Sequence, residues 1–233
     1  MQSALRRFGA ERKKNACLTG HRLRRIDERS RQARLLWKTD KGRIPAMPAL
    51  TGAGNHPIST VMGKLSILFY PDPILRKTAE PVEQVDDELR RLLGQMLETM
   101  RAAPGVGLAA PQIGLSRRAF VMDPAREGEP PAPRCLINPE ILELGEITRI
   151  HEEGCLSLPG IFAEVERPAS IFMRYVDPSG ELREERFEGH AATVAQHELD
   201  HLNGVLFVDH LSRLKRDFLI RKFRKARREE DAV

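Results

Sequence analysis

The sequence predicts an α+β fold with antiparallel or mixed β-sheets. Strand-like segments lie together between residues 118 and 189, and segments with helical periodicity lie before and after them. A doubly wound α/β fold would instead alternate strands and helices along the chain. Helices on both sides of one block of strands therefore favour an α+β domain.

The first helix is expected over residues 86–103. Its apolar residues recur at three- and four-residue spacing, which places them on one face of the helix: Leu89, Leu92, Leu93, Met96, Leu97 and Met100. Asp86 stands where a helix N-cap is needed. Gly94 weakens this helix without breaking it.

Strands are expected in segments 118–123, 135–150 and 163–177, after a glycine-containing loop over residues 105–114. The residues Asp177 to Gly180 read DPSG and indicate a turn, so segment 181–189 is the expected hairpin partner.

Two helices are expected after the strands, over residues 191–202 and 211–229. The second is cationic and amphipathic, and its expected packing face consists of Leu211, Leu214, Phe218 and Ile220.

Residues 1–61 are expected to form a basic, disordered extension, and residues 62–233 the folded domain. The extension holds 14 basic and four acidic residues, whereas the rest of the chain holds 24 and 29. Its few apolar positions cannot offset the entropy lost on ordering. An organellar transit peptide is an alternative, but Glu11, Asp27 and Glu28 do not fit the acid-poor composition of such peptides. A natural start at Met62 also accounts for this segment.

The cysteine count and the hydropathy pattern bear on location. The three cysteines, Cys17, Cys135 and Cys155, are too few for a disulfide framework, which favours a reducing compartment. No stretch of about 18 apolar residues exists, which excludes a membrane span. We therefore expect a cytoplasmic protein.

The predicted helix 191–202 contains the motif HExxH, formed by His197, Glu198 and His201. One helical turn separates the two histidines, so both imidazoles can bind one ion while Glu198 lies beside them. A carboxylate in that position can take a proton from a water molecule and return it to a leaving group, which suits metal-assisted hydrolysis. A helix with two surface histidines is the alternative.

A metal site of this kind needs a third protein ligand. Downstream, Asp209 and His210 are candidates, but the residues after His201 lack the extended motif of the zincin proteases. Upstream, Cys155 lies in a segment flanked by glycine and proline, and its thiolate would leave the fourth position open for water. The alternative for Cys155 is a small buried apolar residue.

The loop over residues 105–112 consists mostly of small residues, which allow another backbone to approach closely. It ends at Gln112, whose side-chain amide is a hydrogen-bond donor. It lacks the lysine of a phosphate-binding loop, and a simple connection from helix to strand is the alternative.

Three segments in this order resemble the three signature motifs of the peptide deformylases: GVGLAAPQ (105–112), EGCLSLP (153–159) and QHELDH (196–201). Three further segments are also similar to that family: ILFYPDPILRKTAEPV (67–82), INPEIL (137–142) and HLNGVLFVDHLS (201–212). The resemblance runs from Met62 to the C-terminus. It implies sheets packed around a central metal-binding HExxH helix, followed by a C-terminal helix.

The resemblance implies a role for each motif residue in the removal of the formyl group from N-terminal formyl-methionine, which releases formate. Cys155, His197 and His201 would bind the metal. Glu198 would act as general base and then as general acid. The side-chain amide of Gln112 and the backbone N–H of Leu156 would stabilise the developing charge on the formyl oxygen.

The resemblance also implies how the substrate binds. The peptide backbone would pair with Gly105, Val106 and Gly107, and would contact Gly154. The methionine side chain would enter an apolar pocket lined by Val106 and Val194, with His151 and His190 at positions where many relatives have aliphatic residues.

The implied cofactor is Fe(II), one ion per chain, with nickel, cobalt or zinc as substitutes. Ligand preferences alone favour zinc for one thiolate and two imidazoles. The implied substrates are N-formyl-methionyl nascent peptides. The basic helix 211–229 could bind ribosomal RNA through phosphate contacts or could simply form a solvated face. We expect a monomer.

Two other functions are compatible with parts of the pattern. A zincin endopeptidase would need a third ligand downstream of His201 and would not depend on Cys155. A metal-binding or ribosome-associated module without turnover would need neither Glu198 nor Gln112.

Overall fold

The structure, a computed structural model, describes residues 60–61, 64–126 and 128–230. The predicted extension lies outside these residues apart from its last two, so the boundary at Met62 stays a prediction. Thr60–Val61 form strand β1, which pairs antiparallel with strand β2 at Lys64–Leu65.

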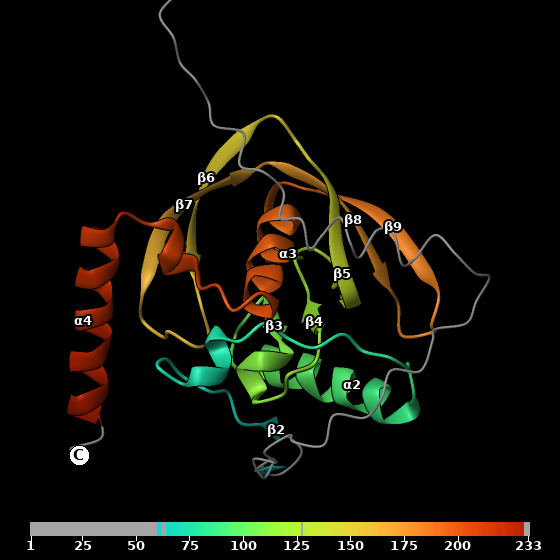
Figure 1. Cartoon of the computed structure of the whole chain (residues 1–233), viewed down its shortest axis with the longest axis horizontal. Helices are drawn as coiled ribbons and strands as arrows, with labels where there is room; N and C mark the ends of the chain where they lie inside the picture. The colour runs from blue at the N-terminus through green and yellow to red at the C-terminus, as the bar shows by residue number, and fades with distance from the viewer. Residues whose placement is uncertain (1–59, 62–63, 127, 231–233) are drawn as a thin grey trace, which may run out of the picture. The chain divides into compact units, whose positions relative to one another are not determined.

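Five antiparallel strands form the main sheet in the order β3-β4-β5-β8-β9. Their bounds are Gly107–Ala109 (β3), Ala119–Met122 (β4), Arg134–Leu144 (β5), Ser170–Val176 (β8) and Leu182–Glu188 (β9). Strands β6 (Thr148–Gly154) and β7 (Phe162–Pro168) form a separate antiparallel pair. Together with the helices, these sheets confirm the predicted α+β class (Figure 1).

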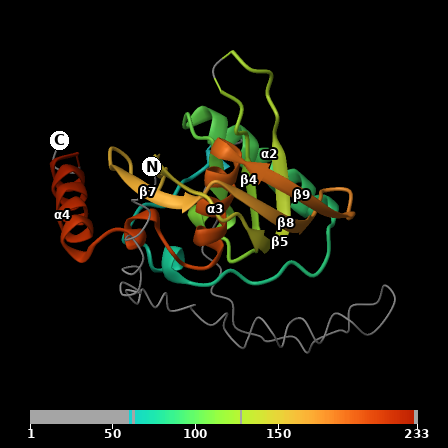
Figure 2. The same cartoon turned by 90° about the horizontal axis from the view of Figure 1, so that it is seen from above.

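The three long helices are α2 (Asp87–Ala102), α3 (Gly189–Leu202) and α4 (Arg213–Glu230). Short 3₁₀ helices cover Pro73–Arg76 (η1), Ala110–Ile113 (η2) and Phe207–His210 (η3). Helix α3 lies between the β6–β7 pair and the five-stranded sheet (Figures 1 and 2). None of the helices in the described part of the chain is both long and apolar enough to span a membrane.

Helices α2 and α3 pack on opposite faces of the five-stranded sheet. Side chains alternate between the two faces of a strand. In β4, Phe120 and Met122 belong to the core formed with α3, while Ala119 and Val121 belong to the core formed with α2. Because apolar side chains cover both faces of β4, that strand is a rigid support for the segments that continue from it.

The expected start of α2 is confirmed, since the Asp86 side chain accepts a hydrogen bond from the backbone N–H of Leu89 at 2.8 Å. The hairpin at Asp177 to Gly180 is also confirmed, because β8 pairs with β9 there.

Three expected features differ in detail. Segment 135–150 divides into β5 and the start of β6, which belong to different sheets. The loop 105–114 contains the three-residue strand β3 and the 3₁₀ helix η2, because its small residues pair with β4 at the edge of the sheet. Segment 163–177 divides into β7 and β8, which belong to different sheets and are separated at Ala169.

The expected packing face of α4 was partly wrong. Leu214 and Phe218 are 79% and 59% exposed. The helix instead buries Leu219 and Phe223, which join a core with residues of β7 and η3. Both faces of α4 carry apolar residues, so its periodicity alone could not select the one that packs.

Candidate metal centre

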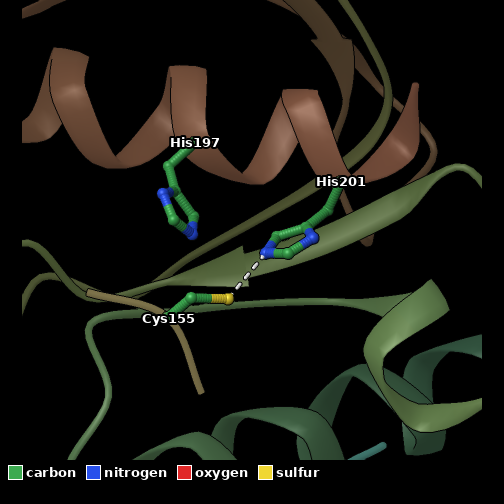
Figure 3. A group of neighbouring side chains, drawn as sticks. All are labelled: Cys155, His197 and His201. Atoms are coloured by element: carbon green, nitrogen blue, oxygen red, sulfur yellow. Dashed lines mark hydrogen bonds between the residues drawn. The ribbon is translucent and has the colours of Figure 1, made fainter. Parts of the chain in front are cut away.

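Helix α3 places two histidines of the HExxH motif on one face. His197 and His201 are buried, and one helical turn separates them. Cys155 follows directly after Gly154, the last residue of β6. Its sulfur lies 3.2 Å from Nε2 of His201, and a dashed line marks this contact in Figure 3. One ligand atom from each of the three residues lies within 4.8 Å of the others.

The three side chains fit a metal ion in both chemistry and spacing. Thiolate sulfur and imidazole nitrogen bind zinc at about 2.0–2.3 Å, so ligand atoms around one ion must lie within a few ångströms of each other. The set Cys155, His197 and His201 meets that condition. Three protein ligands are also the usual number in a catalytic site, where a fourth position is left open.

The two downstream candidates for a third ligand have other partners. Asp209 pairs with Arg76 and accepts the backbone N–H of Leu206 at 2.8 Å. His210 Nε2 lies 2.7 Å from a carboxylate oxygen of Asp200. The structure therefore brings Cys155, and not these residues, to the two imidazoles.

A residue that the sequence analysis missed orients His197. Glu153 is 5% exposed, and its Oε2 lies 2.8 Å from Nδ1 of His197. A hydrogen bond at Nδ1 leaves Nε2 of the same ring for a metal ion, which is the usual arrangement of ligating histidines. The signal in the sequence was an acidic residue two positions before Cys155.

Glu153 is itself held by a buried arginine. Arg167, 5% exposed, donates from Nε and Nη2 to the Glu153 carboxylate at 2.5 and 3.0 Å. Its Nη1 donates to Asp200 at 2.8 Å. Burial alone would raise the pKa of Glu153, but hydrogen bonds from His197 and Arg167 lower it to about 2. Glu153 is therefore a carboxylate at neutral pH.

Burial acts on both imidazoles of the motif. It disfavours their charged form, and together with the nearby His197 it holds the pKa of His201 well below its usual value. Burial also lowers the pKa of His197, but contacts with Cys155 and Glu153 outweigh it and raise that pKa well above the usual range.

Glu198 lies beside the ligand set and is almost fully buried. Its Oε2 atom has no hydrogen-bond partner among the described residues. Burial raises the pKa of this carboxyl to about 7. A group with such a pKa can both accept and release a proton near neutral pH.

Gln112 in η2 is 1% exposed, and its amide has a fixed orientation. Oε1 accepts the backbone N–H of Ala109 at 2.8 Å, which turns the Nε2 donor toward Cys155 and Ser157. Nε2 lies 3.6 Å from the Cys155 sulfur and 3.2 Å from Oγ of Ser157. Ser157 is fully buried and was not singled out from the sequence.

The small residues of β3 and the preceding turn are required by close contacts. A Cβ at Gly107 would overlap the carboxylate of Glu198. A Cβ at Gly105 would lie 2.7 Å from Cδ1 of Leu156. Both contacts place the turn and β3 directly against the metal site, so the segment is more than a helix-to-strand connection.

Residues from the segments described above line one cavity of about 410 Å³. Among its lining residues are the predicted substrate-binding and catalytic positions Gly105, Val106, Gly107, Gln112, Gly154, Cys155, Leu156, His197 and Glu198. The predicted pocket residues His151, His190 and Val194 also line it, as does Thr193. The structure therefore brings the residues of all three sequence motifs to one cavity.

Comparison with known proteins agrees with this arrangement. A family model described as polypeptide deformylase matches residues 64–217. A peptide deformylase of Mesorhizobium japonicum is 57% identical over 159 residues, which cover 68% of this chain and 90% of that protein. One of Agrobacterium fabrum is 55% identical over 162 residues, covering 70% and 95%.

Solved structures give the same result. The crystal structure of peptide deformylase from Thermotoga maritima matches with a TM-score of 0.61 and 50% identity, covering 64% of this chain and 98% of that one. The enzyme from Ehrlichia chaffeensis matches with a TM-score of 0.69 and 40% identity, covering 73% and 99%.

Proposed function

The chain belongs to the polypeptide deformylase family, and on that premise we propose that it hydrolyses the formyl group from the N-terminal formyl-methionine of nascent polypeptides and releases formate. The observation that carries the proposal is the meeting of Cys155, His197 and His201 beside a buried glutamate. A carboxyl group next to such a ligand set is suited to hydrolysis.

Cys155, His197 and His201 would hold the metal, and Glu153 would keep Nε2 of His197 directed toward it. We propose Fe(II), with zinc, nickel or cobalt as substitutes. The bound ion would supply Lewis acidity and lower the pKa of a water molecule.

Glu198 would move the proton. As a carboxylate it takes a proton from the attacking water, and as a carboxylic acid it returns that proton to the leaving amine. Two features support this role: the pKa of the Glu198 carboxyl is raised to about 7, and its buried Oε2 atom has no hydrogen-bond partner among the described residues.

Gln112 and Leu156 would stabilise negative charge on the formyl oxygen. The Gln112 amide is held with its N–H donor facing the site before any substrate binds, because its oxygen is engaged by Ala109. The backbone N–H of Leu156 is the second proposed donor. Loss of one such preorganised donor typically costs about 2.7–4 kcal/mol of transition-state stabilisation.

The substrate backbone would extend the main sheet. Strand β3 is at the edge of the sheet, and the residues from Gly105 to Gly107 line the cavity. An extended peptide can add to such an edge by main-chain hydrogen bonds. Gly154 at the end of β6 would contact the peptide from the other side, and Val106 and Val194 would line the side-chain pocket.

The direct test is formate release from formyl-Met-Ala by metal-loaded protein. We expect activity in the wild type and losses of several orders of magnitude in Glu198→Ala and Cys155→Ala. Metal content separates the two variants, because Cys155→Ala should lose metal and Glu198→Ala should keep it. Full activity in Glu198→Ala would contradict the assigned proton transfer.

We also propose that α4 binds ribosomal RNA near the site where nascent chains emerge. The helix carries many cationic side chains: Arg213, Lys215, Arg216, Arg221, Lys222, Arg224, Lys225, Arg227 and Arg228. Phosphate contacts of this kind weaken steeply as salt rises.

The test of α4 uses exposed lysines, since deleting the helix would uncover the apolar contacts of Leu219 and Phe223. Lys215→Glu combined with Lys222→Glu should weaken ribosome binding at low salt, while Lys77→Glu, outside the helix, should not. Binding that is insensitive to both salt and the α4 substitutions would contradict the proposal.

A further inference from the structure

Three buried side-chain atoms in the described residues lack a hydrogen-bond partner: Nε2 of His151, Oε2 of Glu198 and Nδ1 of His201. Two of these residues belong to the metal centre. His151 belongs to neither the ligand set nor the proposed proton transfer. A buried polar atom without a partner is unfavourable, so a ligand that supplies the partner binds more tightly than one that does not.

The strand geometry places His151 on the cavity side of β6. Alternate residues of a strand face the same way, so His151 and Glu153 share one face. Glu153 contacts His197, and His151 lies two residues before Glu153, about 6.6 Å away along the strand. An extended methionine side chain that begins near the metal centre spans a comparable distance.

Helix α3 brings a second imidazole to the same region. His190, Val194 and His197 recur at four- and three-residue spacing, so they share a helical face, and all three line the cavity. The pKa of His190 is lowered by burial and by the nearby Arg126 and His151. His151 and His190 both line this cavity.

Apart from the atoms of the metal centre, the other walls of this part of the cavity offer no buried side-chain nitrogen or oxygen without a hydrogen-bond partner among the described residues. Thr193 donates its hydroxyl to the carbonyl of Gly189 at 3.3 Å, and Val106 and Val194 are apolar. His151 Nε2 is therefore the buried polar atom of the side-chain pocket that needs a partner.

We propose that His151 makes the pocket accept a side chain that carries a hydrogen-bond acceptor, so that peptides beginning with formyl-methionine sulfoxide are substrates alongside formyl-methionine. The inference rests on the proposed function, which fixes methionine as the first residue. Its sulfoxide retains the length of the side chain and adds an oxygen.

The physical reason is the difference in acceptor strength. A neutral imidazole can present Nε2 as an N–H donor, and a sulfoxide oxygen is a good acceptor for it. A thioether sulfur is a weak acceptor, and the alkyl chain of norleucine offers none. A buried donor discriminates against the side chain that leaves it unpaired.

The test compares three substrates, formyl-Met-Ala, formyl-norleucyl-Ala and formyl-methionine-sulfoxide-Ala, in metal-loaded wild type, His151→Leu, His151→Gln and His190→Leu. The measured quantity is the ratio of kcat/KM for the sulfoxide substrate to kcat/KM for the norleucine substrate. Each ratio comes from one preparation, so partial misfolding or metal loss cancels.

We expect His151→Leu to lower this ratio about 3- to 10-fold, the range for one neutral hydrogen bond. His151→Gln, which retains an amide donor, should preserve most of the ratio, and His190→Leu should change it less than His151→Leu does.

Three outcomes would overturn the inference and leave the proposed function standing. They are an unchanged ratio in His151→Leu, a larger change in His190→Leu than in His151→Leu, and a wild type that hydrolyses only the norleucine and methionine substrates. Failure to hydrolyse all three formyl peptides would overturn the proposed function and the inference with it.

Discussion

Oε2 of Glu153 lies 2.8 Å from Nδ1 of His197, and this contact determines which ring nitrogen of His197 is left for a metal ion. Glu153 belongs to β6 and His197 to α3, so the contact also ties the two-stranded sheet to the central helix. The metal centre is therefore oriented by a residue that would not itself bind the metal.

Replacement of Glu153 by glutamine should weaken metal binding. The amide keeps the shape of the side chain but loses the negative charge that supports the His197 N–H, and such partners typically contribute about 10- to 100-fold in metal affinity. We expect a Zn²⁺ Kd raised by that factor, measured by competition with a chelator. Glu164→Gln, at an exposed position of β7, is the control. Equal affinities in both variants would argue against the orienting role.

Gly107→Ala should reduce catalysis because the added Cβ would overlap the Glu198 carboxylate and displace it. A displacement of about 1 Å can cost about 100-fold in rate. We expect kcat/KM for formyl-Met-Ala to fall by that order while the metal content is unchanged. Gly94→Ala is the matched control, since a Cβ there meets nothing within 4 Å and helix propensity should raise stability by up to about 1 kcal/mol. Wild-type activity in Gly107→Ala would refute the steric argument.

Arg167→Met should lower the free energy of unfolding by about 3–5 kcal/mol, because it leaves the carboxylate of Glu153 buried without its charged partner. Urea denaturation of metal-free protein measures the change. The comparison is Arg174→Met, which breaks a pair with Glu184 near the surface and should cost about 0–1 kcal/mol. Similar losses in the two variants would show that burial of the Arg167 pair has no special effect.

The free energy of unfolding of the protein should depend on the ionisation of Asp209, which lies in η3. Burial raises the pKa of this carboxyl, but the hydrogen bond from Arg76 and the N–H of Leu206 lower it below its usual value. A carboxyl with a lowered folded-state pKa stabilises the protein above its unfolded pKa of about 3.9, and the contribution disappears as pH falls through the folded pKa.

Asp209→Asn should therefore reduce the free energy of unfolding at pH 7 by about 1 kcal/mol, and the difference from wild type should shrink below about pH 4. Urea denaturation of both proteins across this pH range tests the sign. A difference that stays constant as pH falls would contradict the assigned pKa direction.

The sequence by itself was sufficient for features that depend on local periodicity and motif chemistry. The apolar spacing and the Asp86 cap predicted α2, and the DPSG turn predicted the β8–β9 hairpin, because these depend on neighbours in the chain. The HExxH spacing likewise places two imidazoles on one helical face regardless of the rest of the fold. The choice of Cys155 as their companion came from resemblance to a family, since local rules left Asp209 and His210 open.

Contacts between distant segments were decided only by the tertiary structure. Glu153 orients His197, Arg167 neutralises Glu153, and Gly107 lies against Glu198, although each partner is far away in sequence. The same holds for α4, where the shape of the neighbouring core, and not the helix's own periodicity, selected Leu219 and Phe223 over Leu214 and Phe218. Such contacts depend on burial and on the packing of whole elements, and these are properties of the folded chain that no local pattern encodes.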